Sequence, residues 1–196
     1  EIATVHSLDY CSIYNIPLFA DRGQSEAVEN LVREDLDRIV SALVTLGQEE
    51  ALSLTVQCAF SNTNILVVSY EVTGYAAAPA GEGSRFERKL YRMYDLKTNE
   101  RIPIGEAVSF EELKQLAELA GMPVDSLKKQ YEHLEDPIYE MGIGNNPLSV
   151  FLTQEGLCLL TCDYQSSLRL VPREYLLDME ISSRWDDIPV CPEAVR

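Results

Sequence analysis

Carboxylates are the most abundant reactive groups in this chain, which has 32 Asp and Glu residues against 16 Lys and Arg among 196 residues. Two carboxylates held several ångströms apart in a cleft can carry out acid–base or glycosidase chemistry. The acidic residues that the sequence pattern can place fall on predicted helices instead, on a polar face or in a first turn where they complement the helix dipole: Glu34, Asp35, Asp37, Glu111 and Glu112. A carboxylate-dependent hydrolase is therefore an alternative hypothesis and not the first one.

Histidines and cysteines give no metal or nucleophile pattern. Neither His6 nor His133 has a Cys, Asp or Glu at a spacing typical of a zinc site. The five cysteines include no C-x-x-C pair, and an odd number cannot be fully paired within one chain. Cysteines in apolar, strand-like runs usually act as small buried hydrophobes, and three have this setting: Cys58, Cys158 and Cys162. If a disulfide exists, Cys11 and Cys191 near the two ends are the favoured pair.

Sequence motifs of the large enzyme classes are missing from the chain. It contains no nucleophile elbow, no phosphate-binding loop and no H-E-x-x-H helix. Gly142-Ile143-Gly144 resembles the start of a dinucleotide fingerprint, but the third glycine and the strand-to-helix context do not follow. From the residues alone we find no convincing catalytic site, and we expect no cofactor.

Net charge limits the partners. The charge of -16 is spread over both halves of the chain, which argues against nucleic acid. An acidic surface keeps a protein in solution, and it can also attract basic partners. No apolar run approaches the roughly 20 residues of a membrane helix, and no signal-peptide pattern opens the chain. The first residue is Glu1 and not methionine, so we expect a mature product or a fragment, with any membrane anchor upstream.

The clearest helical pattern lies in Ser25–Leu46. Its apolar residues recur every three or four positions and form one stripe, while Ser25 is placed to cap the start and Gly47 to end the helix. Ser109 and Glu112 form a capping box for a second helix that ends at Gly121. Asp125 is expected to cap a third, short helix to about Leu134, followed by a loop over Glu135–Pro147 and a last helical turn from Pro172 to Leu177.

Alternating apolar and polar residues predict strands joined by short turns. The predicted strands are Leu52–Phe60, Ile65–Thr73, Arg85–Asp95, Arg101–Ile104, Leu148–Gln154, Leu157–Tyr164 and Leu168–Val171. The strands are grouped without β-α-β alternation, which is typical of an α+β fold. We predict one domain over residues 1–196: an antiparallel meander sheet with a long N-terminal helix and a helical pair packed on one face.

Several segments in a fixed order carry a family resemblance. Tyr94, Asp95, Leu96, Thr98 and Ile102 fit a strand-turn motif Y-D-L-x-T-x-x-x-I, and Phe151–Leu157 fits an F-x-L-T-x-x-G-L type hairpin with altered first spacing. With the long helix, Val67–Tyr75 and Val171–Leu176, this series resembles the extracytoplasmic domain of RsiV-type anti-sigma factors over about residues 16–177. It is similar also to the accessory domain of PdaC-type peptidoglycan deacetylases, in a family labelled heat-shock-cognate-70-like.

The resemblance implies a non-catalytic domain of the cell envelope, outside the cytoplasm, that binds or senses a ligand. In the RsiV type the ligand is lysozyme, and its binding licenses proteolysis of the anti-sigma factor. A basic protein such as lysozyme, or a cell-wall component, would suit a domain with a charge of -16. The alternative that the resemblance leaves open is an accessory module of an enzyme that modifies cell-wall polysaccharide.

The chain departs from the family pattern in two loops. Tyr75–Pro79 lacks the histidine of a Gly-Gly-Ala-His-like loop, and Tyr164–Ser167 is shorter than an Ala-Pro-Tyr-x-x-Gly-like segment. Aromatic anchors mixed with charge are typical of binding surfaces. The candidate ligand surface combines the loops 74–84 and 135–146, with the residues Tyr75, Glu82, Glu135, Asp136, Tyr139, Glu140 and Asn145.

Overall fold

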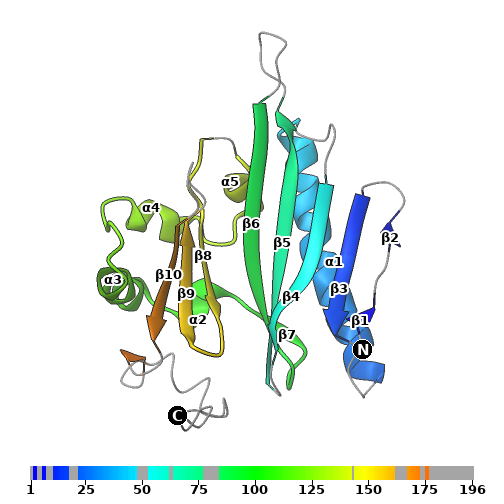
Figure 1. Cartoon of the computed structure of the whole chain (residues 1–196), viewed down its shortest axis with the longest axis horizontal. Helices are drawn as coiled ribbons and strands as arrows, with labels where there is room; N and C mark the ends of the chain where they lie inside the picture. Colours follow the sequence, from blue (N-terminus) through cyan, green and yellow to red (C-terminus); the bar gives the residue numbers. More distant parts are fainter. Residues whose placement is uncertain are drawn as a thin grey trace, which may run out of the picture.

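The computed structural model describes residues 2–3, 6–7, 11–17, 22–47, 53–61, 64–76, 84–142, 144–161, 167–172 and 175–176 (Figure 1). The strands are β1 (Ile2–Ala3), β2 (His6–Ser7), β3 (Cys11–Pro17), β4 (Ser53–Ser61), β5 (Ile65–Ala76), β6 (Ser84–Asp95), β7 (Glu100–Ile102), β8 (Leu148–Leu152), β9 (Gly156–Thr161) and β10 (Ser167–Pro172). The helices are α1 (Arg22–Thr45), α2 (Ile104–Ala107), α3 (Phe110–Leu119), α4 (Leu127–Glu132) and α5 (Pro137–Met141).

The larger sheet contains the predicted meander and one connection that was not predicted. Its strand order is β1-β3-β4-β5-β6-β7, with β2 beside β3, and β4 to β7 pair antiparallel in sequence order. β3 and β4 run parallel and are joined through α1. Parallel neighbours require such a crossover, usually a helix. The expectation that the chain has no β-α-β connection was therefore wrong at the N-terminal end.

The C-terminal strands form a second sheet. β8, β9 and β10 pair antiparallel in sequence order, as predicted, in a three-stranded sheet. β8 lies beside β6 (Figure 1), where the rings of Tyr91 and Phe151 stack with centroids 3.6 Å apart. The α+β class and the meander connections are confirmed, but the predicted single sheet is divided into two sheets that meet at this contact.

Side-chain alternation on β5 places two cores on opposite faces of the larger sheet. Leu66, Val68, Tyr70 and Val72 belong to the core that contains the apolar stripe of α1. Ile65 and Val67 belong to the other core, which contains α3, α4 and the smaller sheet. The helical pair therefore packs with the smaller sheet, while α1 covers the larger one. α5 packs against α1.

Helix boundaries follow local chemistry in some places and differ in others. α1 begins at Arg22, so Ser25 lies inside the helix and does not cap it, whereas Gly47 at φ +64° ends it as predicted. α4 begins after Ser126 and not at Asp125. The predicted loop over 135–147 contains α5. The helical turn expected from Pro172 to Leu177 lies largely outside the described residues.

The capping box at the start of α3 is confirmed. The backbone N–H of Ser109 donates to Glu112 Oε2 at 2.8 Å, and the N–H of Glu112 donates to Ser109 Oγ at 3.3 Å. Two N–H groups at the helix start are thereby satisfied. Of the helices in the part of the chain that the structure covers, none is long and apolar enough to cross a membrane.

We predict that Ser109→Ala lowers the free energy of unfolding by about 1 kcal/mol, because it removes the side-chain acceptor at the start of α3. Ser126→Ala is the matched control, since Ser126 precedes α4 without a side-chain capping bond. Urea unfolding followed by circular dichroism measures both. Equal losses in the two variants would contradict the role of the capping box.

Candidate functional site

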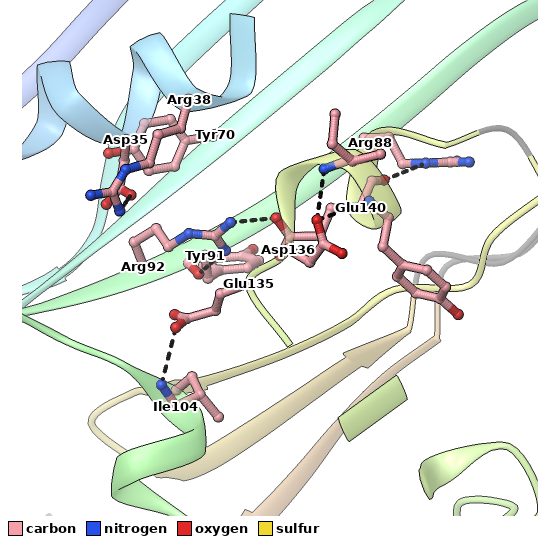
Figure 2. A network of polar contacts seen from close by, with 12 residues as sticks. Asp35, Arg38, Tyr70, Arg88, Tyr91, Arg92, Ile104, Glu135, Asp136 and Glu140 are labelled. Carbon is pink, nitrogen blue, oxygen red and sulfur yellow. Dashed lines mark hydrogen bonds and ion pairs between the residues drawn. The ribbon is translucent and has the colours of Figure 1, made fainter. Parts of the chain in front are cut away.

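A buried polar network joins α1, the larger sheet and α5, and it is the richest cluster of ionisable groups that the structure describes (Figure 2). α1 contributes a carboxylate, β5 and β6 contribute two tyrosines and an arginine, β7 contributes a second arginine, and two further carboxylates come from α5 and the residue before its cap. These residues are Asp35, Tyr70, Tyr94, Arg92, Arg101, Glu135 and Glu140.

The hydroxyls of two tyrosines form a hydrogen-bonded chain that ends at the carboxylate of α1. The hydroxyls of Tyr70 and Tyr94 are 2.6 Å apart, and the Tyr94 hydroxyl donates to Asp35 Oδ2 at 2.7 Å. Burial raises the pKa of both tyrosines, and the charge of Asp35 raises them further. Both hydroxyls therefore stay protonated, and they can act as fixed donors that orient Asp35, which is only 3% exposed.

Arg101 on β7 bridges two carboxylates from distant segments. Its Nε lies 3.4 Å from Asp35 Oδ2, and its Nη2 lies 3.3 Å from Glu135 Oε1. Glu135 Oε2 accepts a hydrogen bond from the backbone N–H of Ile104 at 3.2 Å. Burial raises the pKa of Glu135, although Arg101 and Arg92 act in the opposite direction. The bridge therefore fixes α1, β7 and the residue before α5 relative to one another.

Arg92 and Glu140 form the most deeply buried ion pair that the structure describes, with side chains 3% and 1% exposed. Arg92 Nη2 donates to Glu140 Oε2, and Nη1 donates to the carbonyl oxygen of Tyr91 at 3.0 Å. Burial opposes the charged form of Arg92, but Glu140, Glu135 and Asp35 outweigh it, so the pKa of Arg92 is raised. The guanidinium consequently stays charged inside the protein.

Arg88, two positions before the buried Leu90, binds the backbone of α5. Its Nε donates to the carbonyl oxygen of Glu140 and its Nη2 to that of Gly142, both at 3.2 Å. These carbonyls lie at the C-terminal end of α5, where the helix leaves acceptors without intrahelical donors. Two arginines of one strand thus hold both the side chain and the backbone of α5.

This arrangement fits a scaffold better than a reactive centre. Each of the three buried carboxylates is engaged by arginine, tyrosine or a backbone N–H. A buried ion pair costs desolvation and is retained for geometry as much as for stability. Glu140 Oε1 is a buried acceptor without a hydrogen-bond partner among the described residues. Leaving this oxygen without a partner adds to the desolvation cost of the ion pair.

Three residues of the predicted ligand surface lie in the interior. Glu140 is 0% exposed and pairs with Arg92. Tyr139 is 9% exposed, and its ring stacks on that of His133 with centroids 4.4 Å apart. Glu135 has a buried side chain in contact with Arg101. Their placement on an exposed surface was therefore wrong, because the arginines of the sheet draw both carboxylates inward.

The other predicted contacts are structural or lie outside the described residues. Asp136 Oδ1 accepts from the N–H groups of Ile138 and Tyr139 at 3.1 and 3.4 Å, so it caps α5. Asn145 Nδ2 donates to the carbonyl oxygen of Tyr139 at 3.0 Å. Tyr75 lies in β5, but its side chain falls outside the described residues, as does Glu82 entirely. Asp136 and Asn145 therefore support the local fold, and a shared ligand surface of the segments 74–84 and 135–146 stays a prediction.

Other candidate groups occupy ordinary positions. Glu34 and Asp37 are exposed on α1 as predicted, but Asp35 is buried and not on the polar face. Cys158 is buried and Cys58 is half-buried, and both are free. Cys162, Cys191 and the side chain of Cys11 lie outside the described residues. No group of three or more His, Cys, Asp or Glu suited to a metal ion occurs in the described part of the chain.

The arginines and tyrosines of the network were not predicted from the sequence, although a signal was present. Arg88 and Arg92 alternate with Leu90 and Tyr94 at positions that face α1, and an arginine there requires a buried partner. Asp35 likewise follows Val32 and precedes Leu36 and Ile39 in the apolar stripe. Charges at inward positions of two elements pointed to an interior ion-pair network.

Comparison with known proteins gives structural neighbours and no sequence relative. No family model and no curated protein matches the sequence. A DUF3298 family protein from Pseudomonas aeruginosa is similar with 13% identity and a TM-score of 0.49, over 90% of this chain and 91% of that one. A DUF3298 member from Bacteroides fragilis is similar with 13% identity and a TM-score of 0.45, over 91% and 90%. Likenesses at this level carry no conclusion about function.

We predict that Arg92→Met lowers the free energy of unfolding by about 3–5 kcal/mol, because it leaves the charge of Glu140 buried without a counter-ion. The double variant Arg92→Met with Glu140→Leu is the control, and it should recover most of this loss because no charge remains unpaired. Urea unfolding of the two variants and the wild type tests this. A double variant as unstable as the single one would contradict it.

A second prediction concerns pH. Since burial raises the pKa of Glu135 above 4.5 in the folded protein, the folded state binds this proton more readily than the unfolded state. Relative to Glu135→Gln, the wild type should gain stability as pH falls through the folded pKa, with the full gain reached below 4.5. Urea unfolding between about pH 4 and pH 8 measures this difference.

Glu118→Gln is the control for the pH experiment, because it makes the same chemical change on the exposed surface of α3. It corrects for the general effect of removing one negative charge. A wild type that loses stability relative to Glu135→Gln as pH falls would show that the ion pair with Arg101 outweighs burial.

Proposed function

We propose that this chain is a non-catalytic ligand-binding or sensing domain that works outside the cytoplasm, and that its ligand is a basic protein such as lysozyme or a cell-wall component. One observation carries the proposal: the deeply buried carboxylates, Asp35, Glu135 and Glu140, are committed to holding the fold together. Acid–base catalysis needs a carboxylate that is free to exchange a proton with a substrate. The remaining acidic side chains are therefore the ones available to a partner.

The exposed charge supports a cationic ligand. α1 presents four exposed carboxylates on its outer face, of which Glu26 and Glu29 pair with Arg22 and Arg33 of the same helix. Glu34 and Asp37 are the other two. The whole chain carries a net charge of -16. A field of this sign speeds encounters with basic partners and weakens as salt is added. Recognition by charge alone is unspecific, so aromatic anchors must supply the selectivity.

The location outside the cytoplasm and the absence of catalysis are proposed from the resemblance to RsiV-type and PdaC-type domains. The resemblance rests on strands and turns that the fold uses as scaffold, such as Tyr94, whose hydroxyl donates to Asp35. It therefore supports a shared architecture more than a shared ligand. The segment from Tyr75, near the end of β5, to Glu82 differs from the family pattern. We propose it as the place where this chain selects its own ligand.

We predict that the wild-type chain binds lysozyme, used as the basic probe, and that the affinity falls steeply between about 50 and 200 mM salt. Tyr75→Ala should weaken binding about tenfold, since aromatic anchors dominate interface energies. Isothermal titration calorimetry measures both effects. No salt-sensitive binding to lysozyme or to any other basic cell-wall lytic protein would count against a protein ligand.

A matched pair of charge substitutions distinguishes a direct contact of the loop with the ligand from the long-range effect of net charge. Glu82→Gln and Glu118→Gln remove one charge each, the first in the proposed loop and the second on exposed α3. A loop that contacts the ligand makes the first substitution more costly than the second. Co-sedimentation with insoluble peptidoglycan, in the absence of binding to basic proteins, would instead favour the accessory-module alternative.

A further inference from the structure

We propose that the segment Glu135–Gly142, here called the α5 strap, detaches from the larger sheet and closes on it again as a unit while the rest of the domain stays folded. The strap contains α5, its cap Asp136 and the two carboxylates Glu135 and Glu140. Its role as the moving part of a sensor rests on the proposed function. Its opening is a property of the domain alone.

Charged contacts from the larger sheet hold one side of the strap, and α1 and the ring of His133 pack against it as well. Arg88 and Arg92 of β6 bind the backbone and the carboxylate of Glu140 (Figure 2). Arg101 of β7 binds Glu135. These contacts lie near both ends of the strap and converge on neighbouring strands of the sheet. A segment attached in this way can separate without breaking any strand pairing.

The backbone is bent at both ends of the strap. Glu135 has φ 59°, one of two described non-glycine residues with positive φ, and Gly144, two residues beyond the strap, has φ +81°. The left-handed conformation is unfavourable for a residue with a side chain and persists only where its surroundings enforce it. Five residues are too few for a helix that is stable by itself. The closed geometry therefore depends on docking.

Docking has opposing terms. Tyr139 and Met141 are buried when the strap is closed, which favours the closed state. Against this, two carboxylates lose their water: burial raises the pKa of Glu135, and Glu140 Oε1 finds no hydrogen-bond partner among the described residues. Segments with such balanced terms are the ones that open before the whole protein unfolds.

Opening of the strap would change the contacts of α1. Arg101 contacts Glu135 on the strap and Asp35 on α1, and α5 packs against α1 directly. When the strap leaves, Arg101 keeps only the α1 partner, and Arg92 loses Glu140. The domain then has two arrangements of one element, which is the physical requirement for converting ligand binding into a signal.

Native-state hydrogen exchange of the full chain, without ligand, tests the strap. The amides of Glu140 and Gly142, which donate to Asp136 and Ile138 within the strap, should exchange at least about tenfold faster than the amides in the centre of β5. Their exchange should depend weakly on added urea, because local opening exposes little surface. Equal protection and equal urea dependence at the two places would overturn the proposal.

A pair of glycine variants sharpens the test. Gly144→Ala adds a side chain at φ +81° with nothing within 4 Å, so it strains only the closed hinge and should speed strap exchange about tenfold. Gly47→Ala makes the same change at φ +64° after α1, also with nothing within 4 Å, and should leave the strap unaffected relative to β5. A Gly144→Ala effect that is no larger in the strap than in β5 would also overturn the proposal.

The two proposals can fail separately. The exchange experiment contains no lysozyme, so a rigid strap would leave the binding proposal intact. Failure to bind lysozyme would leave strap opening intact as a property of the fold.

Discussion

Burial of charge beside the core of the larger sheet is the constraint on which the other features depend. Once Arg92 faces α1 from the middle of β6, a carboxylate must lie within reach, because an unpaired guanidinium in the interior would be very costly. Glu140 meets this need only if α5 lies against the sheet next to α1. Arg101, Glu135 and Asp35 repeat the requirement one strand further on. The position of α5 is therefore set by charge before it is set by apolar contact.

Features determined by neighbouring residues could be predicted from the sequence. The apolar stripe of α1, the alternation on β5, the meander connections and the capping box at Ser109 all depend on residues a few positions apart. The start of α1 was misplaced because Ser25, although a good capping residue, lies inside the helix. Local chemistry thus determined many of the elements and only approximately where they begin, and it missed α5 inside the predicted loop over 135–147.

Features determined by distant residues were missed for a common reason. Three features depend on contacts between distant segments: the parallel pairing of β3 with β4, the arrangement of the strands in two sheets, and the ion pairs. Such segments share no local sequence pattern. Arg92 and Glu140 are 48 residues apart, and Asp35 and Tyr94 are 59 apart. The sequence therefore predicted a surface loop of acidic and aromatic residues over 135–147. In the fold, Glu135 and Glu140 pair with arginines of the sheet, and Tyr139 stacks on His133.

The burial of these carboxylates also bears on the proposed function. A carboxylate paired with a buried arginine contributes geometry to the fold but little to the charge that a partner would meet. The proposed binding therefore depends on exposed carboxylates, such as Glu34 and Asp37 of α1. The network joins α5 to the sheet through side chains and without strand pairing, so we expect α5 to be less firmly held than the strands beneath. A domain of this kind can keep a rigid sheet and still offer one element that a ligand could shift, without any catalytic group taking part.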